Sequence, residues 1–142
     1  MVGVDGSEGS KAALDWAVDE AVRRNAHLEV LSAWTVPALV SLVEVGTTIK
    51  DGSWFEKVAT DAMEPMIAAI PAEAAAAIDG IESLVVSGDS AANLISQAVG
   101  ADLLVVGTRG RGGFKGMVLG SVSLQCVLHA PCPVVVVPAG TP

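Results

Sequence analysis

The chain has 142 residues, of which 51% are hydrophobic and 4% aromatic, and its formal net charge is −8. This length and apolar content predict one domain with a core of its own and exclude a wholly disordered chain. The acidic charge argues against nucleic acid or an anionic membrane as a general partner.

Hydrophobic spacing predicts alternating strands and helices in the first half of the chain. Ser7 or Ser10 would cap the first helix, and Asn25 would end it. Pro65 and Pro71 are expected to kink or interrupt a later, alanine-rich helix. The expected elements are the end of a strand at 2–5, a helix over 11–24, a strand over 28–34, a loop over 35–53 and a helix over 54–77.

The second half of the chain continues this alternation. Ser90 is the candidate N-cap of its first helix. The apolar face of that helix would carry Leu94, Ile95, Ala98 and Val99. The other expected elements are a strand over 81–86, a strand over 102–106, a helix over 122–128 and a strand over 134–138.

Strands separated by helices predict a single α/β domain over residues 1–142, with a parallel sheet covered by helices on both faces. The common order for five such strands is 3-2-1-4-5, which puts the topological switch point between strands 1 and 4. Asp5 follows the first of these strands, and Gly107 follows the second. We therefore expect the two residues to share one crevice at the carboxyl ends of the strands.

A glycine-rich loop with three cations joins the fourth strand to the next helix. The strand ends at Gly107, and the helical pattern begins at Gly120 and Ser121. Glycine lets backbone N–H groups approach an anion closely, and the first N–H groups of a helix have no helical partner. The hydroxyl groups of Ser121 and Ser123 would add donors. We interpret the loop as a phosphate cradle whose cations are Arg109, Arg111 and Lys115.

Two other phosphate-binding loops fit this stretch poorly. A Walker A loop needs Gly-Lys followed by Ser or Thr, and the chain has no Gly-Lys pair. The dinucleotide fingerprint G-x-G-x-x-G nearly matches at Gly110 and Gly112, but Lys115 occupies its last glycine position. That fingerprint also belongs after the first strand of its fold. A mobile loop that binds nothing is the remaining alternative.

The spacing Gly107, two residues, Gly110, nine residues, Gly120-Ser121 resembles the ATP-binding signature of the universal stress protein family. The similarity extends to four further stretches, whereas residues 35–80 are nondescript. These stretches are 2–7, 88–95, 101–107 and 130–134. The resemblance implies a Rossmann-like fold of the adenine nucleotide α-hydrolase type.

The resemblance also implies roles for individual residues. The triphosphate and ribose would be held by Gly107, Thr108, Arg109, Gly110, Arg111, Gly112, Gly120, Ser121, Val122 and Ser123. Ala33 would lie against the base, while Gly3 and Val4 would join Asp5 on the ribose and adenine side. A carboxylate repels phosphate but accepts hydrogen bonds from ribose hydroxyls, which favours this place for Asp5. The alternative is that Asp5 only caps the following helix.

The resemblance predicts a cytoplasmic module that binds ATP, with Mg²⁺ on the phosphates, and regulates partners under stress. We find no signal peptide and no apolar stretch long enough to span a bilayer. No general base or carboxylate pair for a metal stands out, so we expect at most slow ATP hydrolysis. The alternatives are a slow ATPase or nucleotidyl-transfer enzyme, a protein that binds AMP or a cyclic nucleotide, and one that binds no nucleotide.

The last strand would be an apolar edge of the sheet, and bare edges tend to be paired. This pattern predicts a homodimer through residues 133–138, as the resemblance also implies. His27 is expected on the surface, Cys126 and Cys132 are expected as reduced, small apolar residues, and no metal site is recognised. The sequence names no downstream partner and no inducing stress. The sequence also leaves open whether residues of the first strand precede Met1 and whether a second domain follows. A second domain would make this chain one half of a tandem protein.

Overall fold

Strands and helices alternate along the chain in the computed structural model, which describes residues 1–36, 52–110 and 119–139. The elements are β1 (Val2–Gly3), α1 (Glu8–Arg24), β2 (Leu28–Trp34), α3 (Ser53–Ala68), α4 (Ala72–Ala77), β3 (Ile81–Ser87), α5 (Ser90–Gln97), β4 (Leu104–Gly107), α6 (Ser121–His129) and β5 (Val134–Val137). Most of the loop expected over 35–53 lies outside the described residues.

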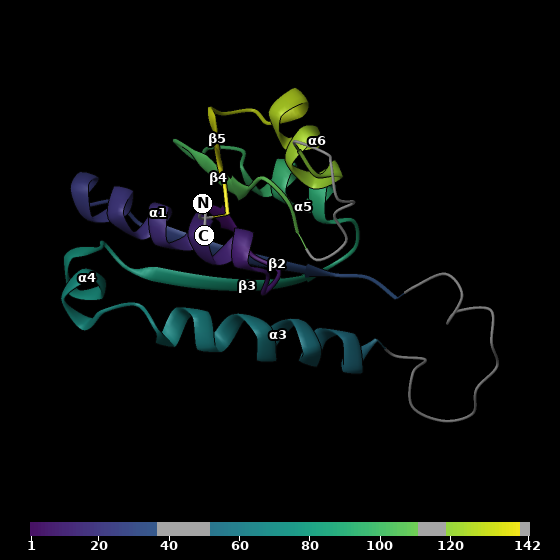
Figure 1. The fold of residues 1–142 in the computed structure, drawn as a ribbon, viewed down its shortest axis with the longest axis horizontal. Coiled ribbons are helices and arrows are strands. Elements are labelled where there is room, and N and C mark those ends of the chain that lie inside the picture. Colours follow the sequence, from purple (N-terminus) through teal and green to yellow (C-terminus); the bar gives the residue numbers. More distant parts are fainter. Residues whose placement is uncertain (37–51, 111–118, 140–142) are drawn as a thin grey trace.

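The five strands form one parallel sheet in the order β3-β2-β1-β4-β5, as predicted. Helices α1 and α3 lie on one face, and α5 and α6 lie on the other (Figure 1). Side chains of β4 alternate between the two cores: Val105 packs toward α1, whereas Leu104 and Val106 pack with α5 and α6. Within the described residues, no helix is both long and apolar enough to cross a membrane.

Local capping chemistry sets the ends of α1. Ser7 is its N-cap, and its hydroxyl oxygen accepts a hydrogen bond from the N–H of Ser10 at 3.2 Å. The helix therefore begins at Glu8, three residues before the predicted start. Asn25 ends it in the left-handed conformation at φ 48°, as its side chain allows.

Only one of the two prolines interrupts the region predicted as a helix over 54–77. Pro65 lies inside α3, which continues to Ala68. Pro71 is the N-cap residue of α4 and separates the two helices, because proline fits the start of a helix better than its interior.

Two expectations for α5 are wrong. Asp89 is the N-cap in place of Ser90, and its carboxylate accepts a hydrogen bond from the N–H of Ala92 at 2.8 Å. Val99 is 73% exposed, because the helix ends at Gln97 and helical spacing no longer applies beyond it. Leu94 and Ala98 are buried as predicted. The following strand begins at Leu104, two residues later than expected.

Candidate functional site

A cavity of about 460 Å³ opens at the carboxyl ends of β1 and β4, where the strand order reverses. The predicted residues that line it are Gly3, Val4, Asp5, Ala33, Gly107, Arg109, Gly110, Gly120, Ser121, Val122 and Ser123. Thr108 is not among the lining residues, and the predicted Arg111 and Gly112 lie outside the described part of the chain. The site residues that the sequence reasoning missed are Ser10, Leu31, Ser90, Leu94, Val106 and Leu119.

The start of α6 presents three backbone donors to this cavity. Gly120 is the N-cap, with no side-chain cap, and the first N–H with a helical acceptor is that of Leu124, which bonds to the Gly120 carbonyl at 3.0 Å. Within the described residues, the N–H groups of Ser121, Val122 and Ser123 have no hydrogen-bond acceptor. These donors and the positive end of the helix dipole together favour an anion.

Hydrogen bonds fix the start of α6 against the end of β4. The Ser123 hydroxyl donates to the carbonyl oxygens of Gly107 at 2.6 Å and Thr108 at 3.2 Å. The Gly120 N–H donates to the Thr108 carbonyl at 2.7 Å. The sequence suggested the Ser123 hydroxyl as a donor to the ligand. Because the residue is only 4% exposed and its hydroxyl already bonds to two carbonyl oxygens, this group joins α6 to β4 instead. Thr108 likewise contributes through its carbonyl oxygen.

Close backbone packing explains the glycine at position 107. A Cβ atom there would lie 2.6 Å from the carbonyl oxygen of Gly9, and one on Gly9 would lie 2.5 Å from the carbonyl oxygen of Arg109. The first turn of α1 can therefore rest directly on the end of β4. Position 107 therefore needs glycine for the contact between β4 and α1, whichever ligand the cavity takes.

Asp5 supports the helix entry and also lines the cavity. Its Oδ1 accepts a hydrogen bond from the Ser7 N–H at 3.0 Å. A Cβ atom on Gly110 would overlap Oδ2 of the same carboxylate, so the loop backbone passes directly over Asp5. The two interpretations of Asp5, as a helix-entry residue and as a residue of the site, are therefore compatible.

The cavity has both apolar and polar lining. Leu31, Ala33, Leu94 and Val106 supply apolar side chains, while Asp5, Arg109 and the start of α6 supply charged and polar groups. Ligand pockets of about 300–1,000 Å³ commonly combine an apolar lining with a few polar groups that orient the ligand. This lining suits a molecule with an apolar part and an anionic part.

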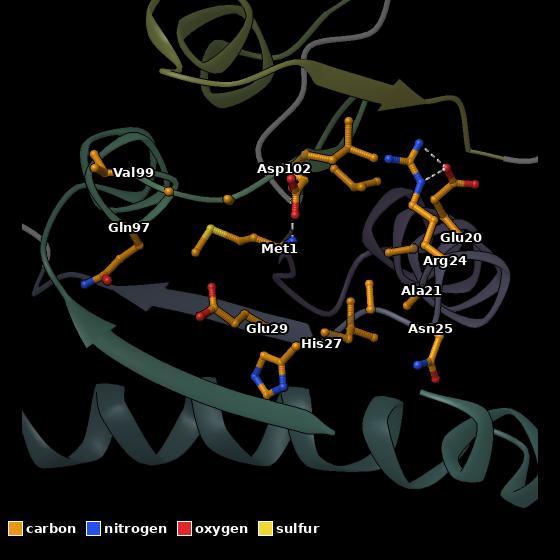
Figure 2. A pocket seen from close by; sticks show the side chains of 17 residues that line it. Met1, Glu20, Ala21, Arg24, Asn25, His27, Glu29, Gln97, Val99 and Asp102 are labelled. Carbon is orange, nitrogen blue, oxygen red and sulfur yellow. Dashed lines mark hydrogen bonds and ion pairs between the residues drawn. The ribbon is translucent and has the colours of Figure 1, made fainter. Parts of the chain in front are cut away.

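A second cavity, of about 600 Å³, lies at the opposite end of the sheet (Figure 2). It is lined by the C-terminal end of α1, where Arg24 is already bonded to Glu20 with Nε 2.6 Å from Oε1. Hydrogen bonds from Arg23 and Arg24 hold the pKa of the Glu20 carboxyl below its ordinary value. Helix C-terminal ends carry partial negative charge, so the end of α1 does not favour an anion as the start of α6 does.

Residues 1–138 match the family model described as "Universal stress protein family". Universal stress protein Rv2623 of Mycobacterium tuberculosis is 35% identical over 96% of this chain, which covers 43% of that protein. The chain thus spans less than half the length of the curated relatives that it matches.

Solved structures support the same assignment. A universal stress protein in complex with cAMP is 28% identical, with a TM-score of 0.68 over 98% of this chain and 95% of that one. UspA from Lactobacillus plantarum shares the fold, with a TM-score of 0.75 and 24% identity over 96% of this chain and 94% of that one. The sequence match and the shared fold agree, and the chain belongs to the universal stress protein family.

Proposed function

We propose that this domain binds an adenine nucleotide in the 460 Å³ cavity and acts as a nucleotide-responsive regulatory module of the stress response. The observation that carries the proposal is the set of three N–H groups, of Ser121, Val122 and Ser123, that find no acceptor in the described structure. A phosphate group supplies the acceptors that these donors lack. We propose ATP as the nucleotide, with Mg²⁺ held by its phosphates.

The mixed lining supports a place for each part of the ligand. The phosphates would lie at the start of α6, beside Arg109 and Gly110. Asp5, with the backbone of Gly3 and Val4, would accept hydrogen bonds from the ribose. The base would lie against the apolar wall at Ala33. Gly107 and Thr108 would position this site through their backbone, and Arg111 and Gly112 would complete the phosphate side.

A cyclic nucleotide or AMP is the second candidate ligand. One solved relative is described in complex with cAMP, and three N–H groups at one helix start are enough for a single phosphate. An enzymatic role has less support. Asp5 is the only Asp, Glu, His or Cys among the described residues of the lining, and one of its oxygens already accepts from Ser7. Slow ATP hydrolysis or nucleotidyl transfer would need a further general base or metal ligand.

Two measurements test the proposed ligand. Purified protein is denatured, and any released nucleotide is identified by chromatography and mass. The melting temperature is then measured with ATP–Mg²⁺, AMP, cAMP and GTP–Mg²⁺. A nucleotide at one hundred times its dissociation constant adds about 2.7 kcal/mol to the free energy of unfolding. If none of the adenine nucleotides raises the melting temperature at millimolar concentration, the proposal is wrong.

A matched pair of variants separates the site from general effects of charge. Asp5→Asn keeps an oxygen that can accept from the Ser7 N–H but removes the negative charge in the cavity. Asp15→Asn removes a charge from the exposed face of α1. We expect only Asp5→Asn to change the dissociation constant of the nucleotide.

We also propose that the domain is a cytoplasmic homodimer that pairs through residues 133–138. β5 is an edge of the sheet, next to β4 alone, and Val134, Val135, Val136 and Val137 are all only partly buried. Bare edge strands tend to be covered by another strand. Light scattering at micromolar concentration should give twice the mass of the chain, and a strict monomer would contradict this part of the proposal.

A further inference from the structure

Three metal-binding side chains meet at the amino-terminal end of the sheet, far from the nucleotide cavity. They are His27, Glu29 and Glu82, and their ligand atoms all lie within 4.8 Å of one another. His27 precedes β2, Glu29 lies on β2, and Glu82 lies on β3. From this cluster we infer a binding site for a first-row divalent cation such as Zn²⁺, separate from the proposed nucleotide site.

The register of β2 against β3 creates the cluster. Glu29 and Glu82 are direct partners in this register, so their carboxylates project from the same face of the sheet. His27 lies two residues before Glu29, and both residues line the second cavity (Figure 2). Two like charges on directly opposed strand positions destabilise a sheet. A bound cation would remove that repulsion.

No basic side chain of the described structure neutralises this pair of carboxylates. Within the described residues, neither Glu29 nor Glu82 has an ion pair with Lys or Arg. His27 lies beside them, with Nε2 3.6 Å from Oε2 of Glu82. The amino group of Met1 lies close enough to Glu29 for their charges to interact, but it donates its hydrogen bond to the Leu103 carbonyl at 3.0 Å. The cluster therefore keeps a net negative charge when His27 is neutral.

The imidazole of His27 is oriented with Nε2 toward Glu82. Its Nδ1 lies 3.0 Å from the carbonyl oxygen of Asp79. A carbonyl oxygen can only accept, so Nδ1 carries the proton of this hydrogen bond, and Nε2 is the ring nitrogen that can bind a metal. Metal-binding histidines commonly donate their other ring N–H to such an oxygen, which fixes both the tautomer and the orientation of the ring.

The backbone around His27 is also fixed. The N–H of Leu28 donates to the Gly80 carbonyl at 3.0 Å, and the N–H of Asp79 donates to the Ala26 carbonyl at 3.2 Å. Gly80 has φ +94°, and a Cβ atom there would lie 3.1 Å from Nδ1 of His27. The ring therefore rests against a position without a side chain, on a segment tied to the start of β3.

An ion can bind once the three side chains draw closer together. Zn²⁺ binds imidazole nitrogen and carboxylate oxygen at about 2.0–2.2 Å in a tetrahedral arrangement, so two of its ligand atoms are about 3.5 Å apart. The ligand atoms of the cluster lie within 4.8 Å of one another, so they must approach by up to about 1.3 Å. His27 and Glu82 are exposed, and rotation of the carboxylates can close that difference. One nitrogen and two carboxylate oxygens suit Zn²⁺ or Co²⁺ better than Mg²⁺, which prefers oxygen ligands alone.

The test is metal binding by the full chain without a histidine tag or nucleotide. Equilibrium dialysis with Zn²⁺ should give one bound ion per chain, and Co²⁺ should give a visible absorption band. His27→Ala, Glu29→Gln and Glu82→Gln should each weaken Zn²⁺ binding by about 10-fold or more, since the loss of a group that merely orients a ligand already costs 10- to 100-fold.

Two control variants match these changes in residue type. His129→Ala removes an exposed histidine of α6, and Glu73→Gln removes an exposed carboxylate of α4, and both should bind Zn²⁺ as the wild type does. Glu82→Gln has a second expected signature. Without metal its melting temperature should equal or exceed that of the wild type, because the repulsion with Glu29 is gone, and Zn²⁺ should no longer raise it.

Two results would overturn the inference. One is Zn²⁺ binding by His27→Ala with the affinity of the wild type. The other is binding that survives in His27→Ala but is lost in Cys132→Ser, which would place the ion on the partly exposed thiol instead.

Discussion

The variant Ser123→Ala removes the hydroxyl that ties the start of α6 to the end of β4. This group donates to two carbonyl oxygens, at 2.6 Å for Gly107 and 3.2 Å for Thr108, and the residue is 4% exposed. Loss of a buried donor that leaves its acceptors unsatisfied costs about 1–3 kcal/mol. For a domain of this length, that free energy lowers the melting temperature by roughly 3–12 °C.

Ser121→Ala is the matched control, two residues earlier on the same helix. Ser121 is exposed, so its change should stay within about 0.5 kcal/mol. The assay is thermal unfolding of both variants without nucleotide, followed by titration of Ser123→Ala and the wild type with ATP–Mg²⁺. Ser123→Ala should also bind nucleotide more weakly, because the three N–H donors of α6 are no longer held at the end of β4. Equal melting temperatures for the two variants would refute this account of Ser123.

Three further predictions follow from the same region. Gly120→Ala should fold normally, since φ is −77° and the new methyl would lie no closer than 3.4 Å to the nearest non-adjacent atom. It should lose the nucleotide-dependent rise in melting temperature, because that methyl stands beside the N–H donors of α6. Gly107→Ala should lower the free energy of unfolding by about 1–3 kcal/mol in denaturant titrations, because its methyl would press on the Gly9 carbonyl at 2.6 Å. Burial raises the pKa of the Cys126 thiol from 9.0 to about 11. In the native protein at pH 8, a thiol reagent should therefore modify Cys132 and spare Cys126. Because the unfolded chain loses the Cys126 proton at lower pH than the folded protein does, the free energy of unfolding should fall as pH rises from 9 to 11.

Each of these three predictions has a result that would contradict it. A Gly120→Ala protein that keeps the full nucleotide response would show that the methyl does not meet the ligand. A Gly107→Ala protein as stable as the wild type would contradict the close backbone contact. Rapid modification of Cys126 under native conditions would mean that the thiol is not shielded as the structure has it.

Much of the fold was predictable because its signals are local or topological. The capping roles of Ser7 and Asn25 depend on the chemistry of single side chains, and the strand order follows from the alternation of strands and helices. The same order brings Asp5 and Gly107 to one cavity. The prediction of Ser90 as an N-cap was wrong, because the neighbouring Asp89 is of a residue type that caps helices equally well.

Other features depend on contacts that the sequence does not encode at short range. The hydroxyl of Ser123 meets Gly107, sixteen residues earlier, only because α6 packs on the end of β4. The need for glycine at Gly9 arises where α1 touches the same strand end. His27 is exposed, as predicted, but its contact with the Asp79 carbonyl crosses 52 positions of the chain and exists only once β2 and β3 pair, so the sequence does not reveal it.

In the proposed function, the start of α6 binds the phosphate of an adenine nucleotide. The most direct measurement is a titration of ¹⁵N-labelled protein with ATP–Mg²⁺, observed through the backbone amide resonances. We expect those of Ser121, Val122 and Ser123 to shift and saturate together, while those of Asn25 and Glu29 at the opposite end of the sheet stay in place. Unchanged resonances for the three α6 amides at millimolar nucleotide, or saturable shifts only at the opposite end, would contradict the claim.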